Sequence, residues 1–207
     1  MQQRIKERGI KHLTHFTKLQ NLGSILKGGI IPRQELERRS LEFAFSDQSR
    51  VDGETEASCF SITFPNYKMF YNLRMRDLNQ KWVVVGCSPR ILWEKDCAFC
   101  CENAASKAVT TIPVAARKGL PAFEKLFAPV MGKPSRSDLK LADSVPTNPQ
   151  AEVLVFDVVA PEYIVGVACD SADLVSGLKA RYPGVNFSHV PGFFSARQDF
   201  SHWKSAA

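Results

Sequence analysis

Gln150-Ala151-Glu152-Val153-Leu154-Val155-Phe156 is the stretch of this 207-residue chain that constrains its fold most strongly. The apolar run after Glu152 is rich in β-branched residues and predicts a buried strand over residues 151–159. A carboxylate at the end of such a strand is costly to bury unless it is paired or lies in a cleft. Glu152 is therefore either an ordinary strand-end residue that faces water or the acidic group of a functional site.

Other strands and short helices are predicted around this strand. Alternating or β-branched apolar runs predict strands over residues 10–15, 58–64, 82–87, 97–101, 164–168 and 185–190. Apolar residues at helical spacing predict helices over residues 17–27, 68–73, 89–93, 120–131 and 171–182, and part of 103–118. Thr17 is the expected N-cap of the first helix, and Gly28-Gly29 its stop. The polar segments 34–56 and 134–149 predict long loops. The sum is a mixed α+β fold in a single compact domain over residues 1–207.

The chain is basic, and its charge is unevenly distributed. Lysine and arginine total 27 against 21 acidic residues, which gives a net charge of +6. Much of the excess lies in residues 1–39 and 68–81. Each stretch is either a solvated face or a surface for an acidic partner such as nucleic acid.

The cellular compartment of the protein can be inferred from its six cysteines and from the lack of an apolar targeting segment. No signal-peptide h-region is visible, and no run approaches the roughly 18–20 apolar residues of a membrane span. We therefore expect a cytoplasmic protein with reduced thiols and no membrane contact. Cys97, Cys100 and Cys101 are spaced closely enough for a metal, but a second ligand pair and a nearby histidine are missing. The sequence predicts no metal.

Four groups of short segments follow one another along the chain. They are His12-Leu13-Thr14-His15 with Asn21-Leu22 and Gly28-Gly29; Ser49-Arg50-Val51-Asp52-Gly53; Pro65-Asn66-Tyr67-Lys68-Met69-Phe70-Tyr71; and Gln150-Ala151-Glu152. Together they resemble the DarT family, the toxin half of DarT–DarG toxin–antitoxin pairs, which attaches ADP-ribose from NAD to bases of single-stranded DNA. The resemblance extends in order from His12 to Trp203.

The resemblance implies an ADP-ribosyltransferase-like domain, with a mixed central sheet split around an NAD cleft and flanked by short helices. NAD would be a cosubstrate, single-stranded DNA the acceptor, and a macrodomain antitoxin of the DarG type the partner that reverses the modification. A monomer suffices for this chemistry. The modified base, thymine or guanine, stays open.

Two residues are candidates for catalysis on this resemblance. Glu152 matches the glutamate that hydrogen-bonds the nicotinamide ribose, where a carboxylate stabilises the positive charge that develops as the glycosidic bond breaks. Arg50 matches an arginine near NAD and the incoming base. From the sequence alone, Arg50 is equally a surface residue of a long loop.

Further residues match positions that surround NAD in the family. They are His12, Thr14, His15, Asn21, Gly29, Asp52, Met69 and Tyr71. Alternation along a strand places His12 and Thr14 on one face and Leu13 and His15 on the other, so the register decides which histidine faces the ligand. Asn21 is expected to hold the adjacent loop in place. The chain has neither a Rossmann glycine fingerprint nor a Walker A sequence.

Aromatic and cationic residues interleave between Phe64 and Arg76, a composition that suits single-stranded nucleic acid. The expected DNA-binding residues are Lys68, Arg74, Arg76 and Asn103, and Arg197 is a weaker candidate. Alternatively, the segment is a helix that buries its aromatic rings in the core.

Two other functions remain open at this level. One is an NAD-dependent ADP-ribosyltransferase whose acceptor is RNA or protein. The other is a non-catalytic module that binds single-stranded nucleic acid, in which Glu152 has no special role.

Overall fold

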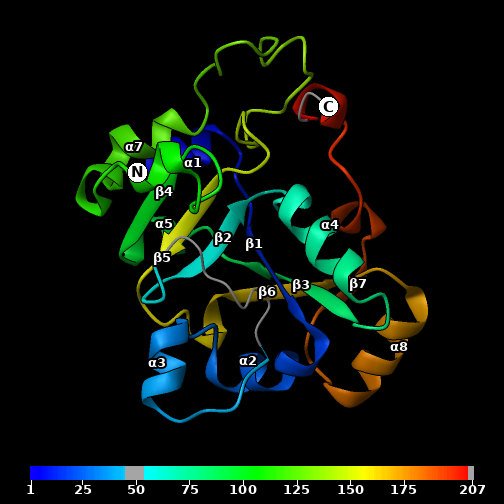
Figure 1. The fold of residues 1–207 in the computed structure, drawn as a ribbon. Helices are drawn as coiled ribbons and strands as arrows, with labels where there is room; N and C mark the ends of the chain where they lie inside the picture. The colour runs from blue at the N-terminus through cyan, green and yellow to red at the C-terminus, as the bar shows by residue number, and fades with distance from the viewer. Residues whose placement is uncertain (45–53, 205–207) are drawn as a thin grey trace.

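A computed structural model describes residues 1–44 and 54–204 (Figure 1). Its centre is a seven-stranded sheet with the strand order β4-β5-β2-β1-β3-β6-β7. The strands are β1 Leu13–Lys18, β2 Ser58–Ile62, β3 Trp82–Cys87, β4 Cys97–Cys100, β5 Glu152–Val155, β6 Ile164–Cys169 and β7 Phe187–His189. All neighbours are antiparallel except β6 and β7, which are parallel. The predicted α+β fold with a mixed sheet is confirmed.

Short helices surround the sheet. The α-helices are α1 Gln2–Glu7, α2 Leu22–Gly28, α3 Arg33–Arg38, α4 Tyr67–Arg76, α5 Ile91–Glu94, α6 Lys107–Thr110, α7 Gly119–Lys125 and α8 Ala172–Arg181. The 3-10 turns are η1 Leu19–Asn21, η2 Val114–Arg117, η3 Pro161–Tyr163, η4 Pro191–Phe194 and η5 Phe200–Trp203. No helix in the described parts of the chain is long and apolar enough to cross a membrane.

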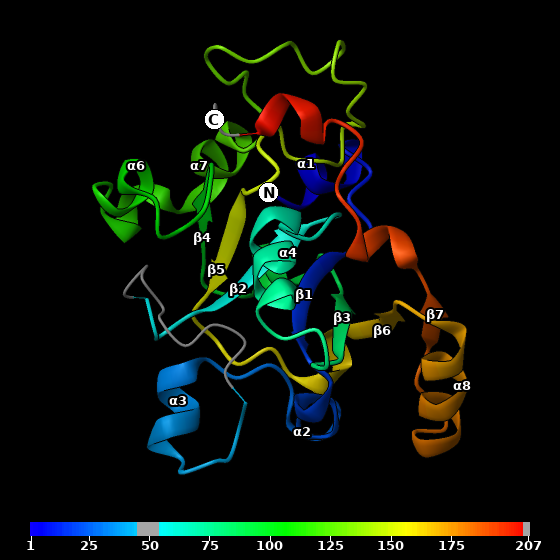
Figure 2. The ribbon, with the colours of Figure 1, turned by 45° about the vertical axis from the view of Figure 1, so that its right-hand side comes forward.

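Both faces of the sheet are covered by apolar clusters. On one face, Leu13, Phe60 and Val153 pack with Phe123 of α7. On the other face, α4 and η4 lie over β3 and β6, and Phe70 is in the cluster they form. Figure 2 shows α4 in front of the sheet. Leu22 of α2 packs with Val83 and Val167, in a cluster separate from that of α4. The aromatic helix is thus partly a core element, as one of the sequence alternatives held.

The sheet is weakly joined at its middle. β1 pairs with β3 over its whole length, but with β2 only at Leu13↔Ile62 and Thr14↔Ser61. Beyond Thr14, β2 pairs with β5 instead of β1. The two halves of the sheet therefore separate along β1 and β2, which is the split that the resemblance implied.

Several predicted boundaries move in the structure. Thr17 lies inside β1 and caps no helix, because pairing with β3 continues to Lys18. The strand predicted over 151–159 ends at Val155, and only Val159 returns to pair with Ile30. α1 was not predicted, since its six residues carry a single buried apolar side chain, Ile5.

An acidic residue ties α1 to α7 and makes stability depend on pH. Glu124 accepts hydrogen bonds from Arg4 and Arg8, each at 2.7 Å. The bond from Arg4 is the main cause of a Glu124 pKa lowered to about 2 from 4.5. A depressed folded-state pKa stabilises the protein above about pH 4.5, and this contribution is lost as the pH falls toward 2.

Glu124→Gln is therefore expected to lower the free energy of unfolding at pH 6 and to flatten its dependence on pH between 4.5 and 2. Urea unfolding at several pH values measures both. Glu162→Gln, an exposed acidic residue without such partners in the described structure, is the control. An unchanged pH dependence in Glu124→Gln would show that the ion pairs contribute nothing.

Candidate active site

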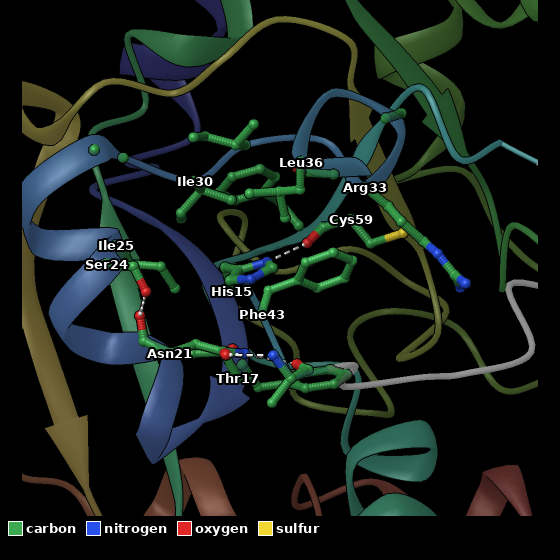
Figure 3. Close-up of a pocket in the computed structure, with 18 of the residues that line it drawn as sticks. His15, Thr17, Asn21, Ser24, Ile25, Ile30, Arg33, Leu36, Phe43 and Cys59 are labelled. Carbon is green, nitrogen blue, oxygen red and sulfur yellow. Dashed lines mark hydrogen bonds between the residues drawn. The ribbon is translucent and has the colours of Figure 1, made fainter. Parts of the chain in front are cut away.

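A cavity of about 500 Å³ opens at the split between β1 and β2 (Figure 3). Its walls come from β1, from residues 21–31, from α3 and residues 41–44, and from β2; Met69 and Glu152 complete it. This volume lies within the usual range for small-molecule sites. The pocket occupies the place where the backbone of β1 has no partner in β2, so the split in the sheet creates it.

Glu152 is the acidic group of this pocket. It is 4% exposed, and its two carboxylate oxygens accept from different donors. The Asn66 side-chain amide donates to one oxygen at 3.0 Å, and the Ala104 backbone N–H donates to the other at 2.8 Å. Two accepted hydrogen bonds suit an ionised carboxylate, which has only acceptors. The carboxylate is thus fixed in orientation and able to stabilise positive charge in a bound molecule.

Asn66 links this carboxylate to α4. It is the N-cap of α4, and its Oδ1 accepts from the backbone N–H of Met69 at 3.2 Å. Its own backbone N–H donates to Ser61 Oγ at 3.1 Å, and its side chain is completely buried. Asn66 was not among the site residues expected from the sequence. Its position directly before a helix was the available signal, because asparagine is a preferred N-cap.

Asn66→Asp and Asn66→Ala are expected to separate the two roles of this residue. Aspartate keeps the cap but brings a second carboxylate to Glu152, which disfavours the ionised pair. Alanine loses the cap, at a cost of about 1 kcal/mol, and leaves Glu152 one donor short. Both variants should lose activity by about tenfold or more. The initial rate of the catalysed reaction measures the loss of activity, and the midpoint of thermal unfolding measures the loss of stability. Wild-type rates in Asn66→Asp would contradict the assigned contact.

The structure decides between the two candidate histidines. His15 lines the pocket, and its Nδ1 lies 2.8 Å from the carbonyl oxygen of Cys59 (Figure 3). His12 precedes β1, bonds the carbonyl oxygen of Thr63 at 3.0 Å and does not line the pocket. Of the two histidines, His15 is the one that lies in the wall of this pocket. The His15 ring bridges β1 and β2 just where their backbone pairing stops.

Three other predicted residues lie in the pocket wall. The hydroxyl of Thr14 donates to the carbonyl oxygen of Ser61 at 3.3 Å. Asn21 binds both the N–H and the carbonyl of Ala44 at 2.8 Å, so it holds this part of the loop as expected. Gly29 has φ +86°, and a Cβ there would lie 2.2 Å from the carbonyl oxygen of Val159. Only glycine permits this approach.

The remaining predicted residues differ in where they lie relative to the pocket. Arg50 and Asp52 lie outside the described residues. Met69 lines the pocket, whereas Tyr71 does not and is 54% exposed. The expectation for Tyr71 was wrong, because two residues along a helix correspond to a rotation of about 200°. Asn103 lies beside the pocket, with its amide nitrogen 3.8 Å from the sulfur of Met69.

Two predicted DNA contacts are occupied by other interactions. Lys68 Nζ donates to the carbonyl oxygen of Trp203 at 2.9 Å. Arg74 donates to the carbonyl oxygen of Phe194 and lies over the Phe70 ring. Both side chains are half-buried, and these contacts fasten the C-terminal segment to α4. Arg76 is exposed.

Buried arginines elsewhere were not recognised from the sequence as structural residues. Arg197 is 6% exposed and pairs with Asp199 at 2.6 Å, so it is no DNA contact. Arg117 is 5% exposed, and it donates to Glu54 at 3.0 Å and to Cys100 Sγ at 3.4 Å. Spacing in the sequence gave no sign of either pairing.

The cysteines do not gather into a metal site. Cys97 and Cys100 are buried in β4, and Cys101 is exposed just after it. Within residues 1–44 and 54–204, no three His, Cys, Asp or Glu side chains are placed to hold one metal ion. Burial raises the pKa of the Cys100 thiol to about 11, so this thiol is protonated at neutral pH.

Comparison with known proteins identifies the family. The sequence profile of the family described as ssDNA thymidine ADP-ribosyltransferase, DarT, matches residues 14–194. No protein in the curated set matches the chain.

Solved structures resemble the fold at low sequence identity. Thermosipho africanus DarTG in complex with ADP-ribose is 19% identical with a TM-score of 0.63, over 89% of this chain and 51% of that one. Thermus sp. 2.9 DarT in complex with carba-NAD+ is 14% identical with a TM-score of 0.60, over 89% and 98% of the two chains. The same Thermus protein in complex with ADP-ribosylated ssDNA is 11% identical with a TM-score of 0.56, over 90% and 97%.

This chain spans about half the length of the Thermosipho protein. The family profile, in contrast, covers nearly all of the elements that build the pocket, from β1 to η4. The chain belongs to the DarT family of ssDNA thymidine ADP-ribosyltransferases.

Proposed function

We propose that the protein transfers ADP-ribose from NAD to thymidine in single-stranded DNA and releases nicotinamide. The observation that carries this proposal is Glu152, an oriented carboxylate in the wall of a pocket, in a chain of the DarT family. The family description favours thymidine over guanine, the two bases that the sequence left open.

The chemistry follows from the carboxylate. As the bond between nicotinamide and the ribose C1′ breaks, nicotinamide leaves with the bonding electrons and positive charge develops on the sugar ring. Glu152 stabilises this charge more in the transition state than in the ground state. An atom of the thymine base then forms the new bond to C1′, and the proton that this atom carried passes to water.

Residues of the pocket wall support the binding of NAD as a cosubstrate. His15, Thr14 and Gly29 come from the first third of the chain, and Met69 from α4 lines the same pocket. Asn21 acts indirectly, because its hydrogen bonds hold Ala44 in the wall. A direct role for Arg50 and Asp52 stays a prediction.

The biological role is proposed by family membership. We infer a cytoplasmic, monomeric toxin that stops growth or defends against phage, with a DarG-type macrodomain antitoxin that removes ADP-ribose from DNA. Support for the antitoxin comes from the Thermosipho DarTG chain, of which this chain covers only 51%.

The test is incubation with NAD and single-stranded oligonucleotides that differ only in one base, followed by mass spectrometry of the products. We expect an added ADP-ribose mass on the thymidine-containing strand and stoichiometric release of nicotinamide. Modification of a guanine strand alone would overturn the choice of base. Intact DNA with NAD cleaved in the presence of RNA or protein would overturn the choice of acceptor, and intact NAD throughout would overturn the activity.

A further inference from the structure

α4 connects the pocket to the outer surface of the protein. At its N-terminal end, Asn66 bonds Glu152 and Met69 lines the pocket. One helical stripe then runs from Met69 through Asn72 to Arg76, at spacings of three and seven residues. Seven residues correspond to about 10 Å along a helix axis. Arg76 therefore lies about 10 Å from Met69 along the axis, at one margin of the exposed side of α4. Tyr71 lies at the other margin, because five residues correspond to a rotation of about 140°.

Three large apolar side chains are exposed on and just after α4. Tyr71 is 54% exposed, Met75 44% and Leu78, just after the helix, 78%. On a helix that serves only to cover a core, such residues face inward, as Phe70 and Leu73 do here. An exposed aromatic and aliphatic surface beside a pocket marks a binding surface.

Charge on this side of α4 favours a polyanion. Arg76 makes no hydrogen bond or ion pair within the described residues, unlike Lys68 and Arg74, whose contacts fasten the C-terminal segment. The nearest acidic residue in sequence, Asp77, accepts from the backbone N–H of Asn79. The chain as a whole carries a net charge of +6.

We propose that the outer side of α4 binds the acceptor DNA strand next to the modified base, with Tyr71 stacking on a neighbouring base and Arg76 meeting a phosphate. Aromatic faces for bases and cations for phosphates are the usual components of single-strand binding. The proposal rests on the proposed function and adds a path for the strand. It assigns Tyr71 to DNA, in place of the NAD contact expected from the sequence.

The test compares two acceptors that share one thymidine: a trinucleotide and a strand of about 20 nucleotides. Tyr71→Ala is expected to raise the KM for the long strand by about 5- to 100-fold. Arg76→Gln should raise it less and reduce the slope of log KM against log salt by about 0.7. For both variants, the KM for NAD and the rate with the trinucleotide should stay at wild-type values.

Lys179→Gln is the matched control, because it removes one exposed cation from another helix, α8. An unchanged KM for the long strand in both α4 variants, with wild type active, would overturn the proposal. Equal losses on the two acceptors would also overturn it, since they would place the defect in the pocket. Normal DNA kinetics with weakened binding of an antitoxin protein would make this side of α4 a protein interface instead. If wild type modifies neither acceptor, the proposed function itself fails.

Discussion

Replacing Glu152 by glutamine is expected to slow ADP-ribose transfer by roughly 10³-fold or more, because a fixed charge at the reacting centre is worth more than any single neutral contact. Glutamine has the shape of glutamate but only one acceptor oxygen. In this pocket both oxygens meet N–H donors, one from Asn66 and one from Ala104. The amide of glutamine would therefore oppose one of them, at a cost of about 1–3 kcal/mol in stability.

The measurement is the initial rate of DNA modification by mass spectrometry, with thermal unfolding recorded on the same sample. Glu162→Gln makes the same chemical change at an exposed site and should keep wild-type activity. If Glu152→Gln transferred ADP-ribose at the wild-type rate, the carboxylate would be structural only. If Glu152→Gln does not fold, the activity of Asn66→Asp is measured instead, because Asn66 donates a hydrogen bond to the Glu152 carboxylate.

Arg197→Met is expected to destabilise the protein by about 3–5 kcal/mol, the usual cost of leaving one charge of a buried pair alone. Asp199 is 3% exposed, and its side-chain donors are Arg197 and the indole N–H of Trp203. Without Arg197, the bond from Trp203 at 2.7 Å would be the one that is left. Burial raises the pKa of Asp199, but the Arg197 contacts outweigh it and the net pKa is lowered. Arg197 also donates to the carbonyl oxygens of Pro146 and Thr147, just before β5.

Denaturant unfolding of Arg197→Met and of the double variant Arg197→Met with Asp199→Leu tests this assignment. The double variant should recover part of the lost stability, because removing both charges removes the buried ion. Arg90→Gln, which breaks an exposed pair with Glu94, is the control and should unfold at the wild-type midpoint. Equal stability of Arg197→Met and wild type would mean that the C-terminal contacts do not support the domain.

Local patterns in the sequence were sufficient for most of the fold. The run Trp82–Cys87 is a strand with the predicted bounds, and Ser171 caps α8 by accepting from the backbone N–H of Leu174. Such signals are local, because a strand or a cap depends on neighbouring residues. The local pattern at Glu152 left two alternatives open, and the resemblance to the DarT family selected it as a candidate.

The hydrogen-bond partners of the site residues could not be predicted from local sequence patterns. Asn66 and Glu152 are 86 residues apart, and Lys68 and Trp203 are 135 apart, so their contacts exist only after the sheet has formed. The exclusion of His12 from the pocket required the register of β1 against β2. Tyr71 was assigned by resemblance to a motif, whereas its helical position determines which way it points.

The strand order has a consequence for synthesis on the ribosome. β1 lies at the centre of the sheet and supplies one wall of the pocket, whereas the carboxylate belongs to β5. At roughly 5–20 residues per second, on the order of ten seconds of translation separate these two strands. A nascent or truncated chain that stops before β5 carries most of the pocket wall but no Glu152. The activity therefore arises only after β5 has been made, and a message interrupted before β5 yields an inactive product.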